Sequence, residues 1–388
     1  MTNEPDKPAA ADHLATLLAH DPLERGPVVP PIVQSSLFTF ASVEQMTRVF
    51  AGEDRRPIYS RGDNPTVQAF EAKMAALEGG EAARGFSSGM GAVAATILAF
   101  VSAGDKMVCV RHVYPDTYRL IRRLLPRLGI ETVFVDGRDR EAVQAALESA
   151  RLLYIENPTS VIFQNHDIAA LAALGKAAGA VTEIDNSWAT PVQQKPLVSG
   201  VDLALHSAAK YLSGHSDTVA GVVIGSAQYI ETINRLTYPF LGAKLAPFEA
   251  WLLLRGLRTL KLRMAQHQTS ALAIAQGLGD HPKVTNIHHP GLASEPNQLV
   301  GTSGLFSIEL ASGVDVALFC DRLRLFRLGV SWGGHESLVF PAMVGLRQAG
   351  EHNSLRDFGI SERLVRLSVG LEEPNDLIAD LEQALTDA

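Results

Sequence analysis

Cysteine is scarce in this chain. The 388 residues include two cysteines, Cys109 and Cys320, which lie far apart and have no metal-ligand spacing. The histidines likewise show no ligand spacing with cysteine or aspartate. Two buried thiols are therefore favoured over a disulfide or a zinc site, and we predict no metal.

An excess of positive charge and long apolar runs are also lacking. Lysine and arginine number 34 against 42 acidic residues, and the net charge of -8 argues against nucleic acid or an anionic membrane as a partner. The longest nearly uncharged apolar segment, residues 91–103, is too short to span a bilayer. Residues 1–8 are polar and contain no apolar core of a signal peptide. We therefore expect a cytoplasmic protein.

The chain does have the composition of a globular protein, with 46% hydrophobic and 20% charged residues. Its length is sufficient for two domains. After a poorly periodic arm over residues 1–60, strand and helix patterns alternate. The predicted strands are residues 106–110, 131–135, 152–156, 181–185, 201–206 and 218–225, with helices at 65–77, 116–128, 140–150 and 167–178. Such alternation predicts a largely parallel sheet that binds ligands at the carboxyl ends of its strands.

The C-terminal part follows a different pattern. A helical pattern with few breakers covers residues 246–279 and leads to a second unit. Strands are predicted there at residues 304–310 and 364–369, and helices at 314–327 and 375–386. This order predicts a smaller α+β domain after the parallel sheet.

One lysine stands out in residues 202–217, Asp-Leu-Ala-Leu-His-Ser-Ala-Ala-Lys-Tyr-Leu-Ser-Gly-His-Ser-Asp. The stretch follows an apolar strand and becomes small and polar around Lys210. A lysine held at a strand end is a candidate amine nucleophile, which forms a Schiff base with a carbonyl cofactor. The preceding strand, residues 181–185, ends in the carboxylate of Asp185. This pair suits pyridoxal 5'-phosphate, whose chemistry needs an amine for the aldehyde and an anion for the ring nitrogen.

Other candidate positions are individually ambiguous. The glycine cluster of residues 85–91 opens a helix and suits a phosphate, although a tight turn is the commoner explanation. Tyr114 follows a strand and is either a ring that stacks on a pyridine or a half-buried loop tyrosine. Arg61 suits a phosphate, but a lone loop arginine is usually solvated. Arg366, in an apolar run, either faces solvent or binds a substrate carboxylate.

Taken together, these segments resemble the Cys/Met-metabolism family of pyridoxal-phosphate enzymes. That family includes cystathionine γ-synthases, cystathionine β- and γ-lyases and methionine γ-lyases. The resemblance extends over nearly the whole chain, from around residue 28 to the end. It rests on Tyr59-Ser-Arg-x-x-Asn-Pro-Thr66, Ser87-Ser-Gly-Met90, Asp185-Asn-Ser-Trp-Ala-Thr-Pro191, residues 202–217, Ser331-Trp-Gly-Gly-His-Glu-Ser-Leu338 and Arg366-Leu-Ser-Val-Gly-Leu-Glu372.

The resemblance implies a fold and a domain organisation. The expected fold is α/β, the fold type I of pyridoxal-phosphate-dependent transferases, with a mostly parallel central sheet and a smaller α+β C-terminal domain. Residues 1–60 would form an N-terminal arm that contributes to a neighbouring subunit. Residues 61–255 would form the cofactor-binding domain and residues 256–388 the C-terminal domain. The implied assembly is a homo-oligomer, a tetramer built as a dimer of dimers with shared active sites.

The resemblance also implies a role for each matching residue. Lys210 would form the Schiff base and then move protons, Asp185 would pair with the pyridinium nitrogen, and Tyr114 would stack on the ring and assist proton transfer. The implied phosphate ligands are Gly89, Met90 and Ser207, with Tyr59 and Arg61 from the adjacent subunit. The implied ligands of the substrate α-carboxylate are Arg366 and Ser331.

Three departures from the family pattern are visible. Ala209 replaces a threonine that usually also binds the phosphate, and one lost hydrogen bond is worth on the order of 1 kcal/mol. Pro115 and Asp116 follow Tyr114, where the family often has two small residues. Ser160 replaces an asparagine that many members have near the ring oxygen. Bacterial cystathionine β-lyases are similar in having a small residue there and in the tryptophan of Ser-Trp-Gly-Gly.

The expected activity is elimination from a sulfur-containing or related amino acid, such as cystathionine, with release of a 2-oxoacid and ammonia. Lys210 would remove the Cα proton in both α,β- and α,γ-elimination, so it does not decide between them. Ile58 and Val330 stand where γ-enzymes that handle cystathionine often carry acids, which favours a short or apolar distal group. Asp116 suits a cationic distal group, although a solvated loop aspartate is an equally good interpretation.

Three other classes remain open from the sequence. The main alternative is a γ-lyase or γ-replacement enzyme that acts on an O-substituted homoserine such as canavanine or O-acetylhomoserine. An aminotransferase shares the same general fold, but the family motifs argue against it. A non-catalytic binding protein would lack the coloured, borohydride-sensitive Schiff base that Lys210 predicts.

Overall fold

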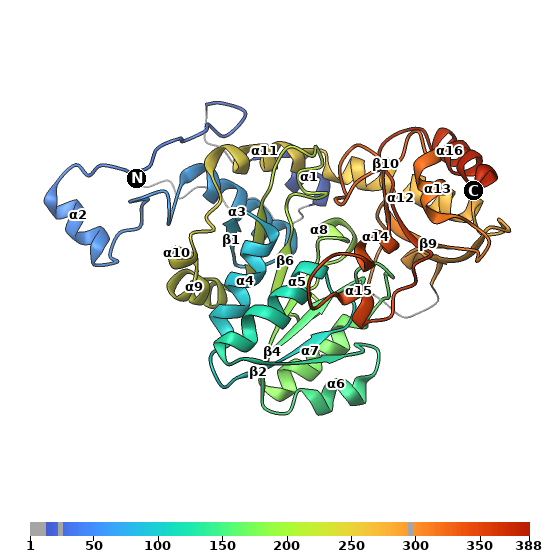
Figure 1. The fold of residues 1–388 in the computed structure, drawn as a ribbon. Helices are drawn as coiled ribbons and strands as arrows, with labels where there is room; N and C mark the ends of the chain where they lie inside the picture. The colour runs from blue at the N-terminus through green and yellow to red at the C-terminus, as the bar shows by residue number, and fades with distance from the viewer. Residues whose placement is uncertain (1–12, 22–25, 294–297) are drawn as a thin grey trace.

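The computed structural model describes residues 13–21, 26–293 and 298–388. The parts of the predicted arm at residues 1–12 and 22–25 lie outside these residues. The described chain contains two sheets, one of seven strands and one of five. Figure 1 shows the second sheet beside the first, with the C-terminal helix α16 on its outer side.

The first sheet is mostly parallel, as predicted. Its strands, in spatial order, are β1 (Ala82–Phe86), β7 (Gly221–Gly225), β6 (Leu203–His206), β5 (Val181–Asp185), β4 (Ala150–Glu156), β2 (Lys106–Val110) and β3 (Glu131–Val135). Strand β7 runs antiparallel to both β1 and β6, whereas the pairs from β6 to β3 are parallel. The central strands are apolar almost throughout because helices cover both faces of the sheet.

The helices that accompany this sheet create one core on each of its faces. They are α3 (Pro65–Glu78), α4 (Gly89–Phe100), α5 (Pro115–Arg119), α6 (Arg140–Ala146), α7 (Ile168–Ala178), α8 (Thr190–Gln193), α9 (Ala227–Leu236), α10 (Tyr238–Leu241) and α11 (Pro247–Arg258). Phe70 and Met74 of α3 are fully buried against Val222 and Ile224 of β7 in one core. In the other core, Ile97 of α4 lies with the apolar residues of β4 and β5.

The second sheet and its helices follow in the chain. The strands, in spatial order, are β10 (Arg327–Leu328), β11 (Leu338–Pro341), β12 (Leu364–Ser368), β9 (Leu305–Leu310) and β8 (Val284–His288). The helices are α12 (Leu260–Gly277), α13 (Val316–Arg322), α14 (Ala342–Leu346), α15 (Ser354–Asp357) and α16 (Pro374–Asp387). A third core joins β9, β11 and β12 to α12, α13 and α16.

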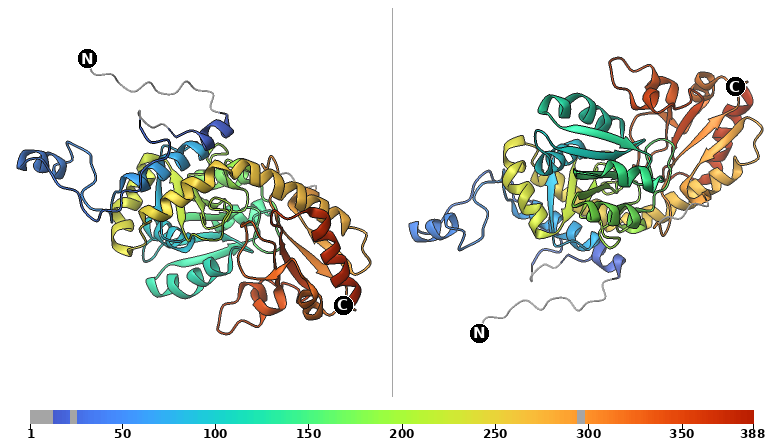
Figure 2. Two further views of the ribbon diagram at one scale, coloured as in Figure 1. Left: turned by 90° about the horizontal axis from the view of Figure 1, so that it is seen from above. Right: turned by 90° about the horizontal axis from the view of Figure 1, so that it is seen from below.

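The N-terminal arm divides into two parts. Helix α1 (Leu14–Ala19) packs Leu18, 1% exposed, into the core formed with α3 and α11. Helix α2 (Val43–Phe50) instead projects away from the body in all views (Figures 1 and 2). The sequence pattern predicted neither helix, since both are shorter than three turns.

Two predicted helices, residues 140–150 and 314–327, are shorter in the structure, as α6 and α13, and two others are interrupted. Residues 246–279 form α11 and α12, which are separated at Thr259 rather than continuous. The Gly256 carbonyl accepts a hydrogen bond from the Arg263 guanidinium at 2.8 Å, and this side-chain bond accompanies the break. Residues 116–128 form α5, a π-helical turn and a 3-10 turn, because Pro126 has no N–H for a regular helix.

Candidate active site

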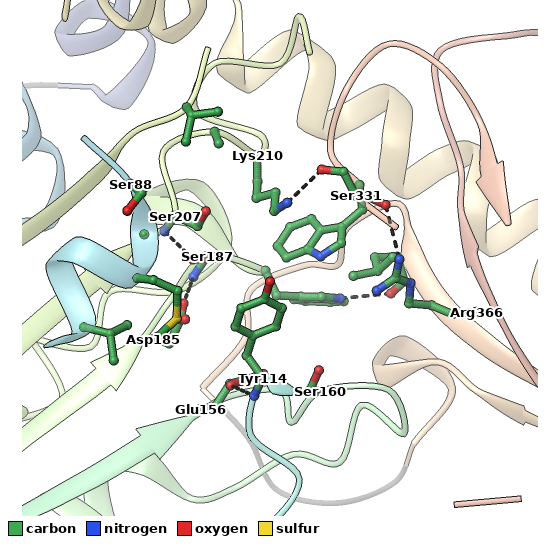
Figure 3. Close-up of a pocket in the computed structure, with 18 of the residues that line it drawn as sticks. Ser88, Tyr114, Glu156, Ser160, Asp185, Ser187, Ser207, Lys210, Ser331 and Arg366 are labelled. Atoms are coloured by element: carbon green, nitrogen blue, oxygen red, sulfur yellow. Dashed lines mark hydrogen bonds between the residues drawn. The ribbon is translucent and has the colours of Figure 1, made fainter. Parts of the chain in front are cut away.

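A cavity of about 540 Å³ lies at the carboxyl ends of β2, β4, β5 and β6, where the second sheet closes over them. Lys210, Asp185, Tyr114, Ser331 and Arg366 all line it. Figure 3 shows these five side chains directed into the same space. The strand-end residues predicted from the sequence, Lys210 and Asp185, therefore line one cavity.

Lys210 lies in the turn that follows β6. Its Nζ donates to Ser331 Oγ at 2.7 Å and lies 5.4 Å from the centre of the Trp332 ring. Burial, together with the positive charge of Arg366, lowers the pKa of Lys210 to about 8, although Asp185 acts in the opposite direction. A larger share of neutral amine at neutral pH makes this lysine a better nucleophile.

Asp185 is the last residue of β5. Its Oδ1 accepts the N–H of Ser187 at 2.9 Å, and Ser187 Oγ in turn accepts the N–H of Ser207 at 2.6 Å. Burial raises the pKa of Asp185, while hydrogen bonds from Ser187 and the charges of His206 and Lys210 oppose the rise. Burial disfavours the ionised form of this carboxyl, and a protonated ring nitrogen placed against it would stabilise that form by its positive charge.

The start of α4 forms a cradle for a phosphate. Ser88 caps the helix by accepting the N–H of Gly91 at 2.9 Å, while the N–H groups of Gly89 and Met90 stand in the first turn, which has no helical acceptors. A Cβ added at Gly89 would lie 2.9 Å from Ser207 Oγ. The helix end and the Ser207 hydroxyl thus converge on one place, and Ala209 contributes no hydroxyl to it.

Arg366 enters the cavity from β12 on the second sheet. Its Nη2 donates to the carbonyl of Val330 at 2.8 Å and to that of Ser331 at 3.3 Å. Burial lowers the pKa of Arg366 to about 10, with Tyr114 opposing the shift, so the side chain remains cationic at neutral pH. An arginine with its fork directed into a cavity suits a carboxylate ligand.

Tyr114 is positioned by two carboxyl groups. Its N–H donates to Glu156 Oε2 at 2.6 Å, and its hydroxyl donates to Asp116 Oδ2 at 3.0 Å. Asp116 also accepts from Arg119 Nε at 2.9 Å. Burial, reinforced by Asp116, raises the pKa of Tyr114 to about 12. Both oxygens of Asp116 are therefore already engaged by neighbouring side chains.

Five residues singled out in the sequence do not line this cavity: Ile58, Tyr59, Arg61, Asp116 and Val330. Tyr59 and Arg61 lie in the arm and contact each other, with the guanidinium carbon 5.3 Å from the ring centre. Val330 is 79% exposed and contributes its carbonyl, not its side chain, to Arg366.

The sequence analysis missed several residues of the cavity. Glu156 ends β4 as Asp185 ends β5, and the same strand-end signal was available for it. Burial, followed by the charge of Asp185, raises the pKa of Glu156 well above its usual range. Phe163, Trp188 and Trp332 form apolar parts of the wall. No local pattern distinguishes these three from core aromatics.

Two remaining sequence expectations concern cysteine and metal. Cys109 and Cys320 are both free and buried, as predicted. Among the described residues, no group of three or more His, Cys, Asp and Glu side chains is arranged to hold a metal ion. No helix in the described part of the chain is long and apolar enough to cross a membrane.

A protein-family model described as Cys/Met metabolism PLP-dependent enzyme matches residues 14–386. The chain belongs to this family. It is 40% identical over 376 residues to an L-methionine gamma-lyase of Pseudomonas putida, and the match covers 94% of each chain. It is also 39% identical over 343 residues to a cystathionine gamma-lyase of Bacillus subtilis, a match that covers 86% of this chain and 90% of that one. The structure is similar to a cystathionine gamma synthase from Xanthomonas oryzae pv. oryzae in complex with aminoacrylate and cysteine, with a TM-score of 0.90, 34% identity and coverage of 97% of this chain and 98% of that one.

Membership of this family identifies the protein as a pyridoxal 5'-phosphate-dependent enzyme of the γ-lyase and γ-synthase group, and its fold as fold type I. The residues present fit the cofactor, since the cavity combines a nucleophilic amine, an anion and a helix-end cradle. When bound, pyridoxal phosphate supplies an aldehyde and an electron-withdrawing ring.

Proposed function

We propose that this enzyme breaks the carbon–heteroatom bond of an amino acid whose distal group is apolar, a thioether of the methionine type, and releases a thiol, a 2-oxoacid and ammonia. The observation that carries the proposal is the wall of the cavity. Val161, Phe163, Trp188, Leu305 and Trp332 line it with aliphatic and aromatic side chains. Trp332 also lies 5.4 Å from Lys210 Nζ. The 40% identity to a protein named L-methionine gamma-lyase supports the same substrate class.

Three carboxylates in or beside the cavity accept hydrogen bonds from within the chain. Glu336 Oε1 accepts from Ser216 Oγ at 2.6 Å. Asp217 Oδ1 accepts from Thr218 Oγ1 at 2.9 Å. Asp116 is held by Tyr114 and Arg119. Each carboxylate thus has a hydrogen-bond donor from within the chain, which favours an uncharged distal group. Glu336 Oε2 is a buried oxygen that has no such donor.

We assign the following roles within this proposal. Lys210 would hold the cofactor through its aldehyde. Its amine would remove the proton from the substrate Cα and then one from Cβ, so that the Cγ–S bond breaks, and would return a proton to carbon or to the leaving group. Asp185 would pair with the protonated ring nitrogen. Arg366, with Ser331, holds the α-carboxylate so that the Cα proton faces Lys210. The hydroxyl of Tyr114 supplies or accepts a proton at the departing heteroatom.

The phosphate completes the assignment. The backbone of Gly89 and Met90 and the hydroxyl of Ser207 bind it on this chain. We propose that Tyr59 and Arg61 reach the same phosphate in a neighbouring subunit, because they lie outside their own cavity. The arm also exposes apolar side chains for such a contact, including Val43 and Phe50, which are 81% and 66% exposed. A dimer of dimers with shared sites, located in the cytoplasm, is part of this proposal.

The decisive experiment is product analysis of the purified holoenzyme with methionine, cystathionine, cystine, canavanine and O-acetylhomoserine. We expect 2-oxobutyrate, ammonia and a thiol from methionine, as α,γ-elimination requires. Pyruvate from cystathionine or cystine would instead identify α,β-elimination. A protein that stays colourless with added cofactor, or a Lys210→Ala variant that keeps a borohydride-sensitive band, would refute the assignment of Lys210.

A second candidate is γ-replacement on an activated homoserine. The observation that favours it is the TM-score of 0.90 with a cystathionine gamma synthase over 97% of this chain. The same assay separates the two reactions when it is repeated with an added thiol. A replacement enzyme forms a new thioether from O-acetylhomoserine, whereas a lyase forms 2-oxobutyrate whether or not the thiol is present.

A further inference from the structure

The cavity wall contains a strained turn at residues 160–162. The N–H of Ile162 donates to the carbonyl of Ser160 at 2.8 Å, and Val161 between them has a φ of 72°. A three-residue turn with a positive φ at its centre is rare and strained. A β-branched residue in that region is a backbone outlier, since its Cβ collides with the neighbouring carbonyl. Phe163, two positions later, also has a positive φ, of 48°.

Both strained residues line the active-site cavity. Residues in sparsely populated backbone regions persist only where the surrounding structure determines them, and they cluster at functional sites. Ile162 lies between them, has no positive φ, and does not line the cavity. It packs instead near Leu355 and Leu364 of the second unit. Val161 also packs against this cluster, so it lies between the cluster and the cavity, whereas Ile162 does not line the cavity.

Several hydrogen bonds hold the turn in this conformation. The N–H of Ser160 donates to the carbonyl of His112 at 2.6 Å, and the N–H of Thr159 donates to that of Gln164 at 2.9 Å. The third anchor is a side chain, since Ser307 Oγ donates to the carbonyl of Val161 at 2.7 Å. Ser307 is fully buried on β9. The anchors are His112 in the loop after β2, Gln164 in the loop after β4, and Ser307 on β9, so the turn is tied to both parts of the fold.

Ser307 connects the turn to the proposed carboxylate site. In the pairing of β12 with β9, Arg366 lies directly opposite Ser307. The paired strands β12 and β9 therefore hold both Arg366, the proposed ligand of the α-carboxylate, and Ser307, which anchors Val161. Since the α-carboxylate fixes one end of an amino-acid substrate, a wall fixed relative to Arg366 limits how far the side chain extends.

We propose that Val161 is a specificity-determining residue, and that the strained turn, anchored through Ser307, places its side chain where it limits the length of the substrate's distal group. The inference rests on the proposed function for its substrate class. It goes beyond that function by naming the residue that sets the upper size. Backbone strain is retained because a relaxed turn would withdraw the Val161 side chain from the cavity.

The strain is measured by comparing Val161→Gly with Val161→Ala in cofactor-free protein. Both variants lose the same isopropyl contacts, but only glycine adopts a positive φ without strain. At an unstrained position the glycine variant melts lower, because glycine has more conformational freedom in the unfolded chain. Here we expect it to melt higher than the alanine variant, by roughly 1–3 °C. A lower melting temperature for Val161→Gly would overturn the claim of strain.

The effect on specificity is measured by binding and not by turnover. Alanine, norvaline, norleucine and 2-aminoheptanoate are titrated into the holoenzyme, and binding is followed by the visible absorbance of the cofactor. These amino acids carry no leaving group. For both Val161 variants we expect the ratio of dissociation constants between the shortest and the longest ligand to shift by roughly tenfold in favour of the longest.

Two further variants serve as controls. Ile162→Ala should lower the melting temperature and leave the ratio unchanged, because its side chain packs outside the cavity. Ser307→Ala should shift the ratio in the same direction as the Val161 variants, because the turn loses its anchor. An unchanged ratio in both Val161 variants, or an equal shift in Ile162→Ala, would overturn the specificity role. Failure to eliminate a thiol from any thioether would refute the proposed function and leave this binding series interpretable.

Discussion

Lys210 and Arg366 share Ser331 as a hydrogen-bond acceptor. Lys210 Nζ donates to the Ser331 hydroxyl at 2.7 Å, and Arg366 Nη2 donates to the Ser331 carbonyl at 3.3 Å. The two cations come from different sheets and meet in one cavity (Figure 3). Their proximity is one reason why the pKa of Lys210 falls to about 8, after the larger effect of burial.

This relationship predicts the pH dependence of cofactor capture. The neutral amine is the nucleophile, so the rate at which apoprotein captures pyridoxal phosphate should rise with pH through a midpoint near the Lys210 pKa of about 8. Arg366→Gln removes a charge that lowers this pKa, and the midpoint should move to higher pH. Arg366→Lys keeps the charge and should leave it nearly unchanged. The rate is followed by borohydride quenching at timed intervals; an unmoved or lower midpoint in Arg366→Gln would contradict the coupling.

Glu156 should matter through the position of Tyr114. Glu156→Ala removes the acceptor of the Tyr114 N–H, and we expect kcat to fall on the order of 100-fold, as misplaced catalytic groups do. Glu156→Gln keeps an acceptor oxygen and should retain most of the activity. Steady-state kinetics and cofactor affinity are measured together for both variants. Equal losses in the two would indicate that the carboxyl acts by its charge rather than as an acceptor.

Asp116 should act on Tyr114 rather than on the substrate. Its carboxylate accepts from the Tyr114 hydroxyl and from Arg119, so a distal cation would have to displace Arg119. Asp116→Ala should therefore reduce kcat/KM for charged substrates such as cystathionine and for neutral substrates such as methionine by similar factors. Removal of a charge that raises the Tyr114 pKa should also lower that pKa from about 12. A loss confined to the cationic substrate would restore Asp116 as a direct ligand.

Sharing of the active site is tested by subunit complementation. Arg61→Ala and Lys210→Ala should each have little activity alone. After unfolding and refolding together, half of the dimers are hybrids, and each hybrid has one of its two sites intact. We therefore expect about a quarter of the wild-type activity to return. Refolding each variant separately and then mixing is the control, and an inactive hybrid would show that Arg61 serves its own subunit or none.

The N-terminal segment should stabilise the fold through a buried charge cluster. Asp21 accepts from Arg258 Nη2 at 2.6 Å and pairs with Lys73, and the Asp21 and Lys73 side chains are 7% and 6% exposed. Burial alone would raise the pKa of Asp21, but the hydrogen bonds from Lys73 and Arg258 outweigh burial and lower it below 3.8. Asp21→Asn leaves two cations without their anion and should cost about 3 kcal/mol at neutral pH.

The pH dependence of that loss follows from the direction of the shift. A carboxyl whose pKa is lower in the folded state stabilises the fold above its unfolded pKa and ceases to do so as the pH falls through the folded one. The difference between wild type and Asp21→Asn should therefore shrink as the pH drops below 3.8. Urea unfolding at several pH values measures it. A difference that stays constant with pH would mean that the loss is not electrostatic.

Features that depend on local order along the chain can be predicted from the sequence alone. An apolar run followed by a polar residue marks a strand end, and this pattern was enough to place Lys210 and Asp185 at one edge of a parallel sheet. The glycine cluster at the start of α4 and the family motifs were equally local. They predicted the cofactor, which the family match confirms, and a catalytic role for Lys210, which stays a prediction.

Contacts between residues far apart in the chain depend on tertiary packing, which local patterns do not encode. Arg366 reaches Lys210 because β12 and β6 belong to two sheets that face one cavity, and no periodicity encodes that approach. Strand β7 reverses direction beside β6, and Thr259 ends α11, through contacts between residues that sequence patterns cannot pair. The strained conformation of Val161 is the clearest case, because it is imposed by Ser307 and other residues far along the chain against the local preference of valine.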